Sequence, residues 1–210
     1  MKQSQKSKKI TIKKTKKSLD KVFYFFDPTS IKTFSDLISN LSKKTAPAIR
    51  KKGFENYLLR NGHQAFSYKN GDVYVMNGAK YNDTEFHIAE KLTTAGYHVM
   101  FPNSGDLGRG RKNDVYIYDT TTYFPYKAEL KSLFGDSAQT IRGRIVSGSG
   151  QAPIIVYDVQ SGIKRNWLIE GLRTGWNSNL RFILLNWKGQ WHKINKDNMF
   201  KKSWFESSLK

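Results

Sequence analysis

Cysteine is absent from this chain of 210 residues. Its absence excludes disulfide bonds, zinc sites built on thiolates and cysteine nucleophiles, and it is compatible with any compartment. Long apolar stretches are absent too: no run approaches the roughly 18 residues that a membrane-spanning helix needs. The N-terminus is basic but has no apolar stretch behind it of the kind that a signal peptide carries. We therefore expect no membrane insertion and a cytoplasmic site of action, with no route of secretion or delivery evident.

Acidic residues are few beside the basic ones. Asp and Glu total 17 against 36 Lys and Arg, which leaves a net charge of +19. A field of that sign attracts polyanions and speeds their encounter with the protein. Nucleic acid is the commonest partner of this kind, and an anionic membrane surface is the usual rival. Because no basic amphipathic helix of the interfacial type is present, the sequence favours nucleic acid.

The chain divides by composition into three parts. Residues 1–20 contain eight lysines and one aspartate, which is typical of a disordered basic tail that either docks on phosphates or only keeps the protein soluble. Residues 21–80 carry mixed patterns without a chemical motif, so we interpret them as an accessory N-terminal α+β module with a hairpin turn at Asn70-Gly71. Residues 81–210 alternate helix and strand, which predicts an α/β domain with a central mixed sheet flanked by helices.

Hydrophobic periodicity and turn residues predict the individual elements. In the accessory module we expect a strand at 22–26, helices at 34–41 and 49–59, and hairpin strands at 65–68 and 73–76. In the main domain we expect helices at 85–95, 140–146 and 167–172, and strands at 97–101, 114–118, 126–133, 154–159, 180–185 and 190–194. A Ser-Gly-Ser-Gly segment at 147–150 is expected to break the chain after the second of these helices.

The strand that ends at Leu133 carries a carboxylate and an ammonium group on one face. With a period of two, Glu129 and Lys131 point the same way, while Leu130 and, allowing for drift at the strand end, Leu133 favour the other face. Asp114 begins the preceding strand, and an antiparallel partner would place it beside Glu129. Two carboxylates on adjacent strands form a hard oxygen site suited to Mg²⁺. On solvated strands the same spacing would also arise often by chance.

The helix expected at 85–95 carries a third carboxylate on its apolar side. Ile88, Ala89 and Leu92 all lie within about 60° of Glu85 on a wheel of 3.6 residues per turn. A lone carboxylate in that stripe is costly unless it is paired or lies near a metal. The competing explanation is a capping box, with Asn82 as N-cap and Glu85 at the third helical position.

In their order, these residues resemble the PD-(D/E)XK nuclease superfamily, and most closely the C-terminal toxin domains of contact-dependent growth inhibition proteins that cut transfer RNA. The resemblance covers roughly residues 81–195. It rests on EFHIAEKLTTAGYHVMF as the acidic helix and first core strand, RKND with Asn113 where many members carry Pro, AELKS as the Glu-x-Lys pair, and SGSGQAPIIVYDV as the following Gln-Ala segment and strand.

The resemblance implies a restriction-endonuclease-like core that hydrolyses phosphodiester bonds of transfer RNA or DNA with Mg²⁺ or Mn²⁺. By this resemblance Asp114 and Glu129 would bind the metal, with the Leu130 carbonyl as an extra ligand. Glu85 would support the metal directly or through a water, and Lys131 would orient or activate the attacking water. The side chain of Gln151 would position the nucleophile or the phosphate, or else hydrogen-bond the backbone at a strand start.

Five basic side chains near these residues are candidates for gripping phosphate, with a solvated surface as the alternative. They are Arg109, Arg111, Lys112, Arg142 and Arg144. If the chain is a toxin, the resemblance implies a small acidic immunity protein as partner. The alternative function is a non-catalytic, basic nucleic-acid-binding accessory protein of a phage or mobile element, whose acidic pair has no chemical role.

Overall fold

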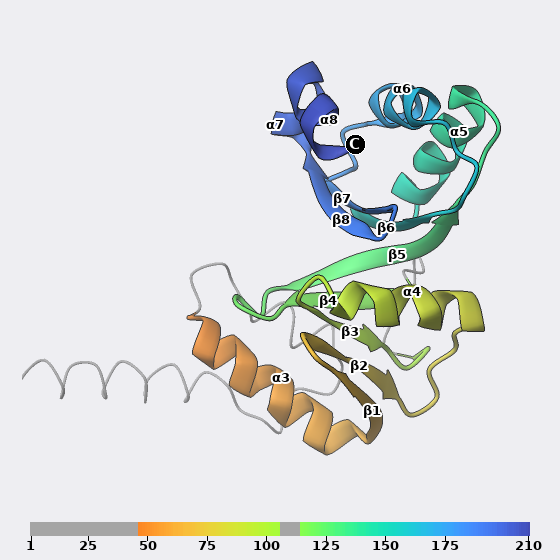
Figure 1. Ribbon diagram of the computed structural model, residues 1–210. Coiled ribbons are helices and arrows are strands. Elements are labelled where there is room, and N and C mark those ends of the chain that lie inside the picture. Colours follow the sequence, from red (N-terminus) through yellow and green to blue (C-terminus); the bar gives the residue numbers. More distant parts are fainter. Residues whose placement is uncertain (1–45, 106–113) are drawn as a thin grey trace, which may run out of the picture.

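The computed structural model describes residues 46–105 and 114–210, and within them it contains eight strands and six helices (Figure 1). The strands are β1 (His63–Tyr68), β2 (Gly71–Met76), β3 (Tyr97–Phe101), β4 (Val115–Asp119), β5 (Pro125–Leu133), β6 (Ile154–Val159), β7 (Phe182–Trp187) and β8 (Gln190–Asn195). The helices are α3 (Pro47–Asn61), α4 (Asp83–Thr93), α5 (Ala138–Ser149), α6 (Arg165–Gly175), α7 (Lys196–Met199) and α8 (Lys202–Ser208).

The eight strands form one mixed sheet in which every strand lies beside its neighbours in sequence. The pairs β2–β3, β5–β6 and β6–β7 are parallel, and the remaining pairs are antiparallel. Parallel neighbours need a crossover connection, and α4, α5 and α6 supply it in turn. The predicted α/β class with a central mixed sheet and flanking helices is confirmed.

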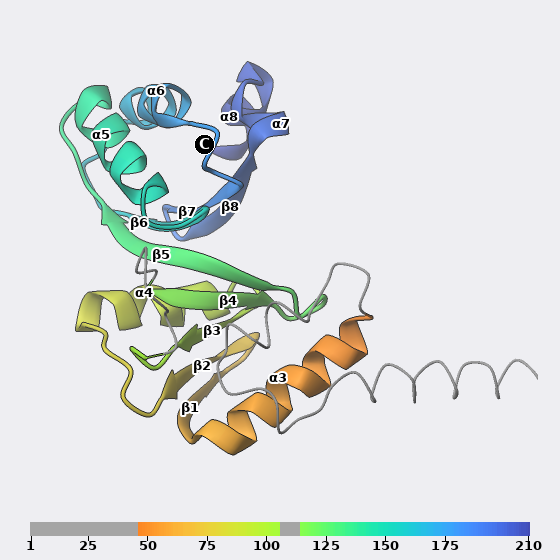
Figure 2. The same ribbon diagram turned by 180° about the vertical axis from the view of Figure 1, so that it is seen from behind.

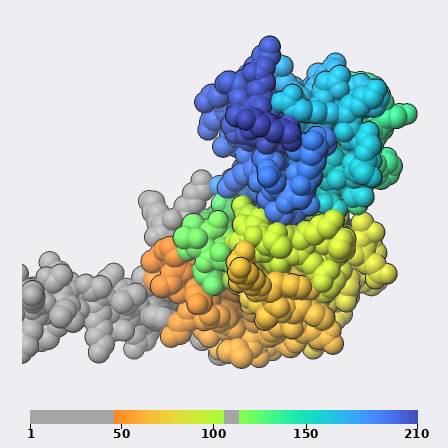
Figure 3. All heavy atoms as spheres, viewed as in Figure 1, coloured from red at the N-terminus to blue at the C-terminus, as the bar shows by residue number. Residues whose placement is uncertain are grey.

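The two faces of the sheet bury three apolar clusters. On one face α4 packs against residues from β2 to β7, through Ile88, Ala89 and Leu92. On the other face α3 covers the β2–β4 half, and α5, α6 and the C-terminal helices cover the β5–β8 half. Figures 1 and 2 show α3 and α4 on opposite sides of the sheet, and Figure 3 shows the C-terminal elements stacked on the N-terminal ones. The second face is therefore covered in two separate parts.

The described part of the proposed N-terminal module joins the same sheet. β1 and β2 pair as the predicted hairpin, with Tyr68 opposite Gly71, and β2 then pairs in parallel with β3. Helix α3 matches the helix expected at 49–59, with Pro47 at its first turn. The expected tail, the strand at 22–26 and the helix at 34–41 lie outside the described residues, and the division near residue 80 stays a prediction.

Helix α5 is longer than its sequence predicts. The prediction that it ends before the 147–150 segment was wrong, because the helix continues to Ser149. A Cβ atom on Gly148 would lie 2.8 Å from Ile155 Cδ1 and 3.3 Å from Tyr157 Oη. The missing side chain thus lets the last turn of α5 approach β6 closely, so this glycine serves packing between elements and does not break the helix.

Among the residues that the structure describes, no helix has both the length and the apolar character needed to cross a bilayer.

Candidate active site

The candidate site lies on the second face of the sheet, at the boundary between its two covered parts. Tyr116 of β4 packs under α3, and Asp114, two residues earlier, belongs to the same face. Leu133 of β5 packs under α5 and α6, and Glu129 and Lys131 share its face. The expectation that Leu133 drifts to the opposite face was wrong, because the strict alternation of β5 persists to its last residue. The charged side chains therefore occupy the strip between the two apolar clusters.

Asp114 and Glu129 meet across adjacent strands. Val115 pairs with Ala128 in the antiparallel register of β4 and β5, which sets Asp114 opposite Glu129 as predicted. The backbone N–H of Leu130 donates to Asp114 Oδ2 at 3.0 Å. That hydrogen bond fixes the aspartate at the start of β4, so the sheet itself sets the spacing of the two carboxylates.

Burial is the main reason that the pKa of each of the two carboxyl groups is raised. Glu129 is only 2% exposed, and burial raises its pKa above its usual range, which hydrogen bonding with Lys131 and Asp114 partly opposes. Burial, followed by the charge of Glu129, raises the pKa of Asp114 to about 7. Two acidic groups that repel each other in a poorly solvated place retain a proton unless a cation compensates them. Asp114 can therefore exchange its proton for a cation near neutral pH.

Lys131 and Gln151 complete the site. Lys131 Nζ lies 2.6 Å from Glu129 Oε1, and its side chain remains 31% exposed, against 3% for that of the glutamate. The Gln151 amide lies beside both: in one orientation its oxygen accepts from Lys131 Nζ at 3.3 Å, and in the other its nitrogen donates to both oxygens of Glu129. The contact is thus between side chains, so Gln151 faces Glu129 and Lys131 from the turn that precedes β6.

Glu85 has a partner that the metal hypothesis did not require. The N–H of Asn82 donates to Glu85 Oε2 at 3.0 Å, and the N–H of Glu85 donates to Asn82 Oδ1 at 2.9 Å. This capping box is the competing explanation stated above, and it is confirmed. Glu85 is half-buried, and its charge also raises the pKa of Asp114 and of Glu129. The carboxylate therefore caps α4 and adds negative potential to the site.

The site offers few protein ligands for a small hard cation. Within the described ranges, no three His, Asp or Glu side chains are grouped so that they could hold a metal together. The site thus offers the carboxylates of Asp114 and Glu129, with the Leu130 carbonyl as the predicted backbone ligand. Mg²⁺ commonly binds through one or two carboxylates and keeps several waters, so two side chains are enough for it. Direct ligation by Glu85 is not required by this arrangement.

A groove continues from Lys131 along α5. It has a volume of about 300 Å³ and is lined by Lys131, Thr140, Gly143, Arg144 and Ser147. Of the two predicted phosphate-binding residues on α5, Arg144 lies in the groove, whereas Arg142 is exposed and contacts Gln139. The other three predicted contacts, Arg109, Arg111 and Lys112, lie outside the described residues.

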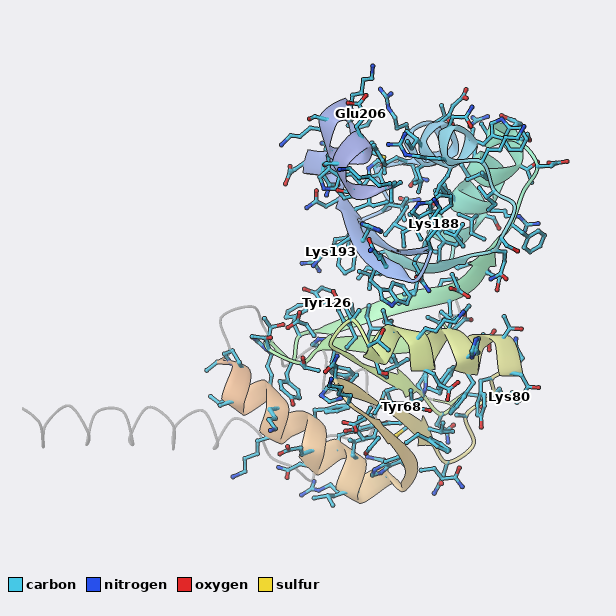
Figure 4. The ribbon with its side chains drawn as sticks, viewed as in Figure 1. Tyr68, Lys80, Tyr126, Lys188, Lys193 and Glu206 are labelled. Atoms are coloured by element: carbon cyan, nitrogen blue, oxygen red, sulfur yellow. The ribbon has the colours of Figure 1, made fainter. Side chains whose placement is uncertain are left out.

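Sequence reasoning missed two aromatic–cation contacts near the site. The guanidinium carbon of Arg144 lies 3.4 Å from the ring centroid of Phe134, which is 51% exposed. On the opposite face of β5, Arg181 lies over Tyr126 at 4.9 Å. Tyr126 also contacts Phe182, over which Lys193 lies; Figure 4 labels Tyr126 and Lys193. Neither pair has a helical or strand spacing in sequence, since the partners lie 10 and 55 residues apart. The only signal in the sequence was Phe134, an aromatic residue directly after a strand that carries charged side chains.

Comparison with family models, curated proteins and solved structures found no match to this chain. The geometry of the site therefore carries the functional argument without support from a relative.

Proposed function

We propose that the chain is a metal-dependent endonuclease with a restriction-endonuclease-like core, and that it hydrolyses phosphodiester bonds of RNA or DNA. The observation that carries this proposal is the pairing of half-buried Asp114 with buried Glu129, with Lys131 Nζ 2.6 Å from the glutamate. Structural ion pairs lower the pKa of a carboxyl group, but here the pKa of both carboxyl groups is raised. A site in that state gains from a bound Mg²⁺ or Mn²⁺.

The residues divide the chemistry among them. A bound divalent ion supplies acidity to a coordinated water and neutralises charge on the phosphate. Asp114 and Glu129 would hold that ion, and the sheet register keeps their separation constant. Lys131 presents a cation to the scissile phosphate or the attacking water, and Gln151 supports either group by hydrogen bonding. Asp114 reaches its ionised form near pH 7, so the metal-binding state is populated at neutral pH.

The net charge of +19 supports a polyanionic substrate over a small phosphorylated one. Arg144 extends the positive potential from Lys131 along α5. A toxin role is part of the same proposal, because an acidic immunity partner would complement this basic surface. Action in the cytoplasm belongs to the proposal as well. The other function to weigh is a non-catalytic nucleic-acid-binding accessory protein. Because the capping box explains the position of Glu85 without a metal, Glu85 no longer counts against an accessory protein. The choice between the two functions therefore rests on Asp114 and Glu129.

Cleavage assays distinguish the two. Labelled transfer RNA, single-stranded DNA and duplex DNA are incubated with the full chain in Mg²⁺, in Mn²⁺ and in EDTA. We expect cleavage of at least one substrate with metal and none in EDTA, and a loss of at least about 100-fold in Glu129→Gln and Lys131→Met. Glu170→Gln, at an exposed position on α6, is the matched control. Binding without metal-dependent cleavage of any substrate would support the accessory-protein function instead.

A further inference from the structure

The groove beside Lys131 has the chemistry of a strand-binding site. Thr140, Arg144 and Ser147 follow each other by four and three residues, so they lie on one face of α5. The opposite face of the helix carries Ile141 and Ile145, which are fully buried. The groove lining thus combines two cations and two hydroxyl groups, and no carboxylate of the described chain lines it. Those groups match the oxygens of a phosphodiester backbone.

A glycine in α5 keeps this groove open. A Cβ atom on Gly143 would meet nothing within 4 Å, whereas one on Gly148 would lie 2.8 Å from Ile155 Cδ1. Glycine inside a helix costs about 1 kcal/mol relative to alanine. At Gly148 close packing against β6 explains that cost, whereas at Gly143 no atom of residues 46–105 or 114–210 lies close enough to explain it. The missing side chain instead leaves the helix backbone accessible from the groove.

An exposed aromatic ring stands at the end of the groove. Phe134 directly follows β5, three residues after Lys131, which separates their Cα atoms by roughly 10 Å at a strand rise of 3.3 Å per residue. Arg144 stacks on the ring of Phe134 at 3.4 Å, and half of the Phe134 side chain nevertheless stays exposed. Arg144 Nε is buried without a hydrogen-bond partner in the described part of the chain. The stack therefore joins a phosphate-binding cation to an aromatic surface.

We propose that this groove binds the backbone of a single strand, with the ring of Phe134 stacked on an unpaired base beside the phosphate that is cut. The position relative to the cut rests on the proposed function, because Lys131 belongs to both sites. An exposed ring can stack only on a base whose face is free, and in a duplex neighbouring base pairs cover both faces. Single-stranded or looped nucleic acid is therefore the preferred substrate class.

Binding measured without metal tests this site apart from catalysis. Fluorescence anisotropy of the full chain is recorded in EDTA, at about 200 mM salt to weaken non-specific phosphate contacts. The probes are a labelled 12-mer as single-stranded DNA, as the same sequence in RNA and as a DNA duplex. We expect tighter binding of the single strands than of the duplex. Phe134→Leu should weaken single-strand binding at least about fivefold and leave duplex binding within about twofold. Phe134→Tyr, which keeps an aromatic ring, should bind single strands as wild type does.

Matched variants separate the groove from general charge and from stability. Phe200→Leu removes another exposed phenylalanine, 58% exposed, and should have no effect on binding. Arg144→Ala should weaken single-strand binding several-fold more than Arg142→Ala, although each removes one positive charge. Gly143→Leu should fill the groove and weaken binding while the free energy of unfolding stays equal or rises, because leucine favours helix.

Three results would overturn the proposed groove site: equal affinity for single strand and duplex, no effect of Phe134→Leu, or unchanged binding in Gly143→Leu. Cleavage that persists alongside any of these would leave the endonuclease proposal intact. Selective single-strand binding without cleavage would have the opposite meaning, because the groove would stand and the catalytic function would fail.

Discussion

Replacing Asp114 with asparagine should stabilise the metal-free protein at alkaline pH. Burial and the charge of Glu129 raise the pKa of Asp114 from an ordinary 3.8 to about 7, so ionising this group in the folded state costs free energy. At about 1.4 kcal/mol per pH unit the full difference would be roughly 4 kcal/mol. Asp114 is only half-buried, and solvent screening reduces the expected effect to roughly 2 kcal/mol. Asparagine still accepts the hydrogen bond from the N–H of Leu130.

The way in which this stability difference changes with pH follows from the raised pKa of Asp114. The folded state binds the proton of Asp114 more tightly than the unfolded state, so this contribution to stability is complete below about pH 4. It is lost as the pH rises from about 4 through 7. Wild type should therefore lose stability over that range relative to Asp114→Asn, by roughly 2 kcal/mol at pH 8 and by much less at pH 4.

Urea unfolding in EDTA, followed by tryptophan fluorescence at pH 4 and pH 8, measures the difference. The control is Glu170→Gln, which removes the charge of an exposed carboxylate on α6 and should not stabilise the protein at pH 8. Added Mn²⁺ should stabilise wild type and leave Asp114→Asn unchanged. The reasoning is refuted if Asp114→Asn is no more stable than wild type at pH 8, or if its advantage is the same at both pH values.

Three further substitutions test contacts on the two faces of the sheet. Gly148→Val should lower the free energy of unfolding by about 1–3 kcal/mol, measured in urea, because its Cβ would lie 2.8 Å from Ile155 Cδ1; an unchanged value would contradict the close approach of α5. Glu85→Gln should keep the capping box and lower the pKa of Asp114, measured by NMR titration, and an unchanged pKa would mean that its charge does not reach the site. Asp158 of β6 accepts hydrogen bonds from Lys91 Nζ and from the buried Asn186 Nδ2, each at 2.8 Å. Asp158→Ala should therefore cost about 2–4 kcal/mol in urea unfolding, and a cost under about 1 kcal/mol would contradict that role.

Local patterns predicted most of the strands and the central pair of the site. Asn70-Gly71 identified its hairpin because the turn depends on those two residues alone. The alternation of β5 placed Glu129 and Lys131 on one face because the pleat has a fixed period. Their position beside Asp114 followed from one antiparallel strand pairing, which the short connection between β4 and β5 favours. These predictions needed only neighbouring elements.

Features that depend on distant contacts were not predictable in the same way. Gly148 looks like a helix breaker until β6 is placed against it, and only then does its missing side chain have a packing role. The sequence left two explanations open for Glu85, the metal and the capping box with Asn82, because a helical wheel shows the apolar stripe but not the hydrogen bonds that decide between them. Helices α7 and α8 were not predicted, since they are short and gain their order from packing on the sheet. The stack of Arg144 on Phe134 depends on how α5 lies against the end of β5.

The position of a bound Mn²⁺ tests the central claim most directly. Crystals of the full chain soaked in Mn²⁺ and measured for anomalous scattering should show one strong peak, about 2.0–2.3 Å from the carboxylate oxygens of Asp114 and Glu129 and from the Leu130 carbonyl. The peak should vanish in Asp114→Asn. A saturating soak that leaves these carboxylates without a peak, or places the ion elsewhere, would contradict the account.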